Sequence, residues 1–284
     1  MKTILKIGSC EAVCDSFGGE LISYRHNGRE IVWTGDGTYW TGHTPVLFPI
    51  VGALVNDTVE IDGAQYSMKK HGFARKSFFE LVASTDTTAT YELKNSEATA
   101  EMYPYAFSLK IKHEIFEDGF KTTYTVKNPS DKEIVFAIGG HPGFCLGNIE
   151  DYKLVFPEEE DCPLYYTDPA SILSDKLVQG GIKGKEMALK YSDYDVDALI
   201  AKDLKSRKTS IVKLDGSFKL DFEWTGFDVL GIWTPPKKCA PFLCLEPWNG
   251  CPAYDTETGK FADKPYVKTL AAGEEYSVGY SVKL

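Results

Sequence analysis

The sequence predicts an all-β protein of antiparallel strands, and three observations support this. Asn-Gly or Asp-Gly dipeptides separate short strand-like runs, which is the strongest local signal for a β-hairpin. Apolar and polar residues alternate with a period of two, as in Ser108 to Phe116, and no segment keeps a 3.6-residue period over several turns. The 16 Tyr, 16 Phe and 5 Trp also suit broad sheets with aromatic cross-strand pairs.

Four hairpins are expected around Asn27-Gly28, Asp62-Gly63, Asp118-Gly119 and Asp215-Gly216. Their strands should cover residues 20–25 and 30–33, 59–61 and 65–68, 108–116 and 120–126, and 210–214 and 218–224. The nearest helical candidate is Lys185 to Tyr191, and the acidic run Glu158 to Asp161 is expected in a solvated loop. Because we find no linker and no internal repeat of fixed period, residues 1–284 are expected to form a single domain.

Composition limits the possible partners. A net charge of −10 argues against a nucleic-acid partner and an anionic membrane surface, and it favours a neutral substrate. The N-terminus lacks the apolar core of a secretory signal, and no apolar run approaches the roughly 18 residues of a membrane span. The seven cysteines are odd in number and show no Cys-x-x-Cys spacing, so we expect reduced thiols, no zinc site and a cytoplasmic protein.

The most distinctive stretch is Gly139-Gly140-His141-Pro142-Gly143-Phe144, which follows the apolar run Ile134 to Ile138. The glycines allow close backbone approaches, and Pro142 holds His141 extended. An imidazole presented at a strand end is a candidate general acid or base. The alternative is a structural histidine bonded to a carbonyl in a tight loop.

A second stretch places a carboxylate in an apolar strand, Phe242 to Gly250, where Glu246 precedes Pro247. A buried carboxylate needs a partner or a function, and desolvation would raise its pKa toward the range of a general base. Trp248 could offer an apolar face to a sugar or a nucleobase.

Two further stretches carry polar groups. In Lys70 to Arg75, His71 and Arg75 could donate to ligand hydroxyls, or Arg75 could bind a phosphate or carboxylate. The structural alternative is a surface ion pair of Arg75 with His71 half-buried. In Tyr191 to Ile200, three acids alternate, but the glycine and closing glutamate of a calcium loop are missing. Asp197 is the acid expected to face a pocket.

Taken together, these stretches resemble the aldose 1-epimerase (galactose mutarotase) family, in particular its LacX-like bacterial branch. The resemblance spans nearly the whole chain and rests on Leu47 to Gly52, His71 to Arg75, Gly139 to Phe144 and Leu245 to Trp248, of which the last two are the specific ones. It implies an antiparallel β-supersandwich with an open cleft. It also implies interconversion of the α and β anomers of a free aldose of the glucose or galactose type, without cofactor or metal.

The resemblance also implies roles for individual residues. Glu246 matches the general base and His141 the general acid of the family. His71 matches the second active-site histidine, and Asp197 matches the sugar-binding aspartate. A protonated His141 and an ionised Glu246 are expected at neutral pH, because their mutual attraction favours both charged states.

By the same resemblance, Trp248 and Phe73 would be walls of the cleft and Arg75 would lie near the pocket. One departure is Ala53, which stands where an arginine often follows the Phe-Pro-Ile-Val-Gly segment of the family. This difference could change the preferred hydroxyl pattern of the sugar or weaken its binding.

Other functions stay open from the sequence alone. A hexose-6-phosphate mutarotase would use Arg75 or a lysine on the phosphate. A catalytically silent sugar-binding or regulatory module needs only the cleft, and a glycoside hydrolase would need Glu246 and a second carboxylate. The chain could be a monomer or a homodimer.

Overall fold

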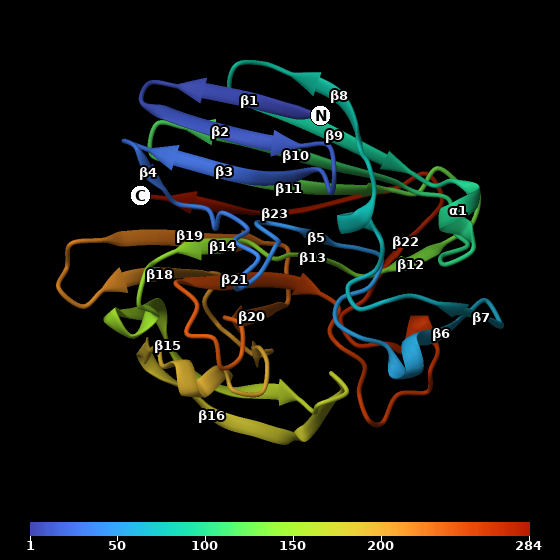
Figure 1. The fold of residues 1–284 in the computed structure, drawn as a ribbon. Helices are drawn as coiled ribbons and strands as arrows, with labels where there is room; N and C mark the ends of the chain where they lie inside the picture. The colour runs from blue at the N-terminus through green and yellow to red at the C-terminus, as the bar shows by residue number, and fades with distance from the viewer.

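The computed structural model describes all residues, 1–284, and it forms an all-β supersandwich of antiparallel strands (Figure 1). The largest sheet has 15 strands. Its path runs through β5 (Val46–Leu47), β13 (Ile138–Gly140), β21 (Phe242–Asn249), β20 (Val229–Trp233), β17 (Leu199–Ala201), β15 (Tyr152–Thr167), β18 (Lys208–Lys213), β19 (Lys219–Thr225), β23 (Glu275–Lys283), β11 (Gly119–Lys127), β10 (Ser108–Phe116), β9 (Thr88–Lys94) and β8 (Glu80–Ser84). Off this path, β14 (Gly143–Cys145) pairs with β21 and β16 (Leu173–Ala188) pairs with β15.

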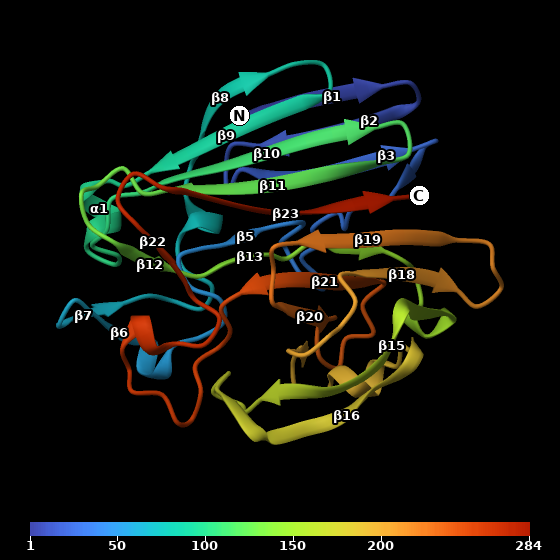
Figure 2. The same ribbon diagram turned by 180° about the vertical axis from the view of Figure 1, so that it is seen from behind.

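A second sheet contains β1 (Lys2–Ile7), β2 (Cys10–Asp15), β3 (Glu20–His26) and β4 (Arg29–Glu30). Figures 1 and 2 show this sheet lying against the β9, β10 and β11 part of the large sheet. The hydroxyl of Tyr24 donates across the layers to the carbonyl of Phe116 at 3.0 Å, and that of Tyr91 donates to Oγ1 of Thr3 at 2.8 Å. These hydroxyls fix how the two sheets meet.

The other elements are short. Two separate strand pairs are β6 (Thr58–Ile61) with β7 (Ala64–Ser67) and β12 (Ile134–Phe136) with β22 (Lys268–Leu270). The α-helix is α1 (Glu97–Ala100), and the 3₁₀ turns are η1 (Val55–Asp57), η2 (Ala74–Lys76), η3 (Ile149–Asp151), η4 (Tyr191–Tyr194) and η5 (Phe261–Asp263). None of these helices has the length and apolar character needed to cross a membrane.

The main core lies between the layers and contains 61 buried residues. Strand β10 shows how the period of two builds it, because Leu109, Ile111 and Ile115 are buried whereas Lys110 is exposed. Aromatic rings fill much of the space. For example, the ring centroids of Tyr24 in the small sheet and Phe120 in the large sheet lie 5.1 Å apart. The alternation in the sequence is therefore the alternation between core and solvent.

The four expected hairpins are confirmed, since the strands on both sides of each turn dipeptide pair antiparallel. The first two turns have the positive φ angles expected of these dipeptides: 49° and 80° at Asn27 and Gly28, and 51° and 80° at Asp62 and Gly63. Asparagine, aspartate and glycine tolerate this region better than other residues.

Two local expectations are wrong. The segment Lys185 to Tyr191 is not an α-helix, because strand β16 continues to Ala188 and pairs with β15. Only its last residue, Tyr191, begins the 3₁₀ turn η4. Its helix-forming residues are overridden by this pairing. The acidic run Glu158 to Asp161 is not a loop but part of β15, and Glu160 within it is buried.

Glu160 has a structural task that gives the first prediction. Its carboxylate accepts the backbone N–H groups of Lys205 at 3.0 Å and Ser206 at 2.8 Å. Glu160→Ala leaves both donors unpaired, so we expect unfolding free energy to fall by about 1–3 kcal/mol in urea titrations. The exposed neighbour Glu158→Ala is the control, and an equal effect of both changes would contradict the assignment.

Candidate active site

The register of strand β21 brings His141 and Glu246 together. Gly139 of β13 pairs with Trp248, and Gly143 of β14 pairs with Cys244. The two pairs belong to one antiparallel register, so His141, midway between the glycines, lies opposite Glu246. Opposite residues of an antiparallel pair point to the same face of the sheet. The distant segments named in the sequence therefore meet by ordinary strand pairing.

Glycines clear this face around the two side chains. A Cβ atom at Gly139 would lie 2.6 Å from Cδ1 of Trp248, and one at Gly231 of β20 would lie 2.6 Å from its Cζ2. Real Cβ atoms do not approach other atoms so closely, so the indole of Trp248 can lie there only because both neighbours lack side chains. Gly139 and Gly231 thus make room for the indole of Trp248.

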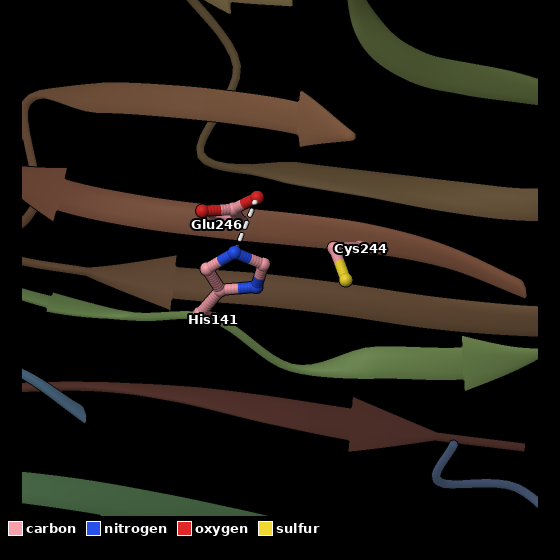
Figure 3. Close-up of side chains that lie close together, drawn as sticks. All are labelled: His141, Cys244 and Glu246. Atoms are coloured by element: carbon pink, nitrogen blue, oxygen red, sulfur yellow. Dashed lines mark ion pairs between the residues drawn. The ribbon is translucent and has the colours of Figure 1, made fainter. Parts of the chain in front are cut away.

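His141 Nε2 lies 3.2 Å from Oε1 of Glu246 (Figure 3). The imidazole stacks on the indole of Trp40, with centroids 4.7 Å apart and planes at 25°. The ring of Trp233 meets it edge-on at 5.3 Å. Contacts with Trp40, Trp233 and Glu246 hold the imidazole in one orientation, with Nε2 toward Glu246.

Burial acts on the charge state of both members of this pair. The side chains of His141 and Glu246 are 8% and 2% exposed. Burial lowers the pKa of His141 to about 3 and raises that of Glu246 well above its usual range, to which the nearby Asp197 also contributes. Burial therefore favours the uncharged forms of both side chains, against the ion pair that was expected from the sequence.

His71 lies on the same cleft in a defined tautomer. Its Nδ1 accepts the backbone N–H of Gly52 at 3.1 Å, so the proton of the neutral ring is on Nε2. Burial, with smaller effects from Arg75 and His141, lowers the pKa of His71 well below its usual value. His71 is therefore a neutral hydrogen-bond donor. The next residue, Gly72, passes so close to Phe48 that a side chain there would collide with its carbonyl.

Asp197, Lys70 and Arg75 form the polar side of the cleft. Nζ of Lys70 donates to Oδ2 of Asp197 at 3.0 Å, and Nη2 of Arg75 donates to the carbonyl of Lys70 at 2.8 Å. Nε of Arg75 is buried without a partner. Both cations lower the pKa of Glu246 and oppose part of the burial effect.

The cleft that these residues share has a volume of about 200 Å³. This is below the roughly 300–1,000 Å³ of sites for drug-sized ligands and suits a small molecule. The hydroxyl of Thr167 and the indole N–H of Trp248 both line it, and both are buried without a hydrogen-bond partner. The cleft thus offers several unused polar atoms to a ligand.

Six of the seven residues expected at the site line this cleft: Glu246, His141, His71, Asp197, Arg75 and Trp248. Phe73 does not, which corrects its expected place as a wall. Its ring is buried and packs edge-on against Phe48 at 6.2 Å and beside Phe107 at 6.0 Å. It is a core residue below the His71 turn.

The sequence analysis missed Trp40, Trp233, Lys70 and Thr167. Trp40 lies in the irregular segment 34–45, where no pattern marks a site; the indole N–H of Trp33 holds it by donating to its carbonyl at 2.8 Å. Tryptophan is rare, and three of the five residues line the cleft, so rarity was the available signal. Lys70 was the first residue of a stretch already singled out, but it was not named as a site residue.

One group of side chains has the donor types of a metal site. His141, Cys244 and Glu246 each place one ligand atom within 4.8 Å of the others (Figure 3). All three are buried. Imidazole, thiolate and carboxylate are the ligands that zinc uses in proteins.

This fold and cleft define a class of protein. The chain belongs to the aldose 1-epimerase family, whose model matches residues 2–283. It is similar to the plasmid-encoded protein LacX of Lactococcus lactis subsp. lactis, with 29% identity over 95% of this chain and 94% of that protein.

Solved structures agree. A galactose mutarotase related enzyme from Lactobacillus acidophilus has a TM-score of 0.93 at 28% identity, covering 100% of this chain and 97% of that one. A galactose mutarotase-like protein from Lactobacillus casei has a TM-score of 0.93 at 26% identity, covering 100% and 99%. The likeness supports the supersandwich over the whole length of this chain.

The neutral pair gives a prediction that needs no assay of function. Because the folded pKa of Glu246 is raised, the folded state binds more protons than the unfolded state, and stability falls as pH rises above the unfolded value of about 4.5. Glu246→Gln removes this loss. In thermal melts, the melting temperature of the variant should rise relative to that of the wild type as the pH increases from 4 to 8.

The exposed change Glu158→Gln is the control and should show no such trend. A Glu246→Gln variant that loses stability relative to the wild type as pH rises would instead indicate an ionised, paired carboxylate.

Proposed function

We propose that this protein is a cofactor-independent aldose 1-epimerase that interconverts the α and β anomers of a free aldose. The observation that carries the proposal is the buried contact of 3.2 Å between Nε2 of His141 and Oε1 of Glu246 in a small polar cleft. Membership of the aldose 1-epimerase family agrees with it.

Ring opening needs two proton transfers, one at each of the two oxygens bonded to the anomeric carbon. Opening the ring removes the proton of the anomeric hydroxyl and delivers a proton to the ring oxygen, and both oxygens are bonded to the same carbon. A carboxylate and an imidazolium that lie side by side match these two oxygens. After rotation about the C1–C2 bond, the two groups exchange roles and close the ring to the other anomer.

The reactive charge state arises within the pair. The proton on Glu246 moves to Nε2 of His141, which gives the base and the acid without a change in net charge. The indole face of Trp40, stacked on the imidazole, stabilises the imidazolium by a cation–π interaction. Lys70 and Arg75 stabilise the carboxylate. Each positioned proton-transfer group contributes roughly 10²–10⁴ in rate.

Lys70 and Arg75 favour a second candidate, a mutarotase of a phosphorylated hexose. Against it, Lys70 is already paired with Asp197. Inhibition of glucose turnover by hexose 6-phosphates at low concentration would select this candidate.

We place the protein in the cytoplasm, because all seven cysteines are free thiols and thiols stay reduced in that compartment.

Polarimetry tests the proposal directly. Freshly dissolved α-glucose and α-galactose should relax faster with the protein than in buffer, and Glu246→Gln should reduce the rate by about 10²–10⁴ because one proton-transfer group is lost. Glu158→Gln is the matched control. Relaxation at the buffer rate for several aldoses would refute the activity, and saturable sugar binding by calorimetry without anomerisation would indicate a binding module.

Asp197 gives a separate prediction about binding. Its carboxylate lines the cleft but is not one of the two proton-transfer groups, so Asp197→Ala should raise KM with a smaller effect on kcat. A lost hydrogen bond to a charged group costs about 1.5–3 kcal/mol, or roughly 10- to 100-fold. Asp195→Ala, two residues earlier and exposed, serves as the control in initial-rate measurements. An unchanged KM would remove Asp197 from the sugar site.

A further inference from the structure

The cluster of His141, Cys244 and Glu246 has a property that the proposed reaction does not use. Cys244 and Glu246 are two residues apart on β21 and so face the same side, and the register places His141 opposite Glu246. Nε2 of His141 faces Glu246 (Figure 3), so it is the ring nitrogen that an ion bound by Glu246 would meet.

The spacing of the cluster is close to that of a zinc site. With bonds of about 2.3 Å to sulfur and about 2.0–2.2 Å to nitrogen and oxygen, tetrahedral zinc holds its donor atoms about 3.3–3.7 Å apart. The 3.2 Å between His141 and Glu246 already fits this range. No two ligand atoms are more than 4.8 Å apart, so small side-chain rotations of about 1 Å would bring Cys244 into range.

Charge also suits a divalent cation. Protein ligands bind zinc in their deprotonated forms, which here are a neutral imidazole, a carboxylate and a thiolate. The resulting site contains Zn²⁺, one carboxylate and one thiolate, and its net charge is zero. A neutral assembly avoids the cost of an uncompensated charge in a buried place. The fourth position opens to the cleft, which His141 and Glu246 line.

We propose that His141, Cys244 and Glu246 bind one soft divalent cation of the zinc type, and that this ion blocks the site. Metal binding is independent of the proposed function, whereas the inhibition rests on it. The ion occupies both proton-transfer groups at once, so anomerisation and metal binding exclude each other. The site therefore acts as an inhibitory centre and not as a catalytic metal centre.

Binding is tested on the full chain after removal of metal with EDTA. Competition with a chromophoric chelator should give one Zn²⁺ per chain. Cobalt(II) in place of zinc should give a thiolate-to-cobalt charge-transfer band in the near ultraviolet, which reports the Cys244 ligand in the unmodified fold. Cys244→Ala should abolish the band and weaken zinc binding at least tenfold.

Two other cysteines are the controls. Cys14→Ala removes a buried thiol of β2, and Cys239→Ser removes the exposed thiol, and both variants should bind zinc as the wild type does. Absence of the cobalt band from the wild type, or zinc affinity that Cys244→Ala leaves within twofold, would overturn the metal site.

Inhibition is measured by polarimetry with the same variants. Equimolar Zn²⁺ should slow anomerisation at least tenfold, EDTA should restore it, and Cys244→Ala should resist the inhibition. Zinc binding in a protein that never accelerates anomerisation would support the metal site and refute the proposed function. Stoichiometric zinc binding with an unchanged rate would overturn the inhibition.

Discussion

The site depends on the pairing of β21 with two consecutive short strands, β13 and β14, in one register. This register makes His141 the partner of Glu246, and it puts glycine opposite Trp248 and Cys244. A one-residue slip would turn Glu246 to the other face of the sheet. The neighbouring strand β20 continues the arrangement, because Gly231 lies opposite Glu246 and Trp233 opposite Cys244. The cleft thus lies on a face of the large sheet where glycines stand opposite Trp248, Cys244 and Glu246.

Burial of this pair opposes stability. Burial in the sheet interior favours the neutral form of the Glu246 carboxyl group, and it also favours the neutral form of the His141 imidazole beside it. The surroundings partly compensate for this, since Lys70 and Arg75 act on the carboxyl group and Trp40 covers the ring. Strained or desolvated groups of this kind concentrate at functional sites, where stability is given up for chemistry.

The sequence predicted those features that depend on local chemistry. Turn dipeptides located the four hairpins, and the glycine-rich strand end located His141. Contacts from the tertiary structure could not be predicted in this way. Pairing with β15 overrode the helical composition of Lys185 to Tyr191, and Phe73 turned toward Phe48 although its neighbours His71 and Arg75 line the cleft. The metal-type cluster escaped a search for Cys-x-x-Cys spacing because its ligands come from two segments about 100 residues apart along the chain.

The neutral pair has a further meaning for the proposed reaction. Once a carboxylate has taken the proton of the anomeric hydroxyl and an imidazolium has protonated the ring oxygen, Glu246 is neutral and His141 is neutral. This is the protonation state that burial favours for the two side chains. In the proposed reaction, burial thus favours the protonation state of the pair that accompanies the open-chain aldehyde over the ion pair that accompanies either ring form. The proton transfer from Glu246 to His141 that precedes ring opening in the proposed reaction is therefore uphill, and its cost is offset by the charges of Lys70 and Arg75 and by the indole face of Trp40.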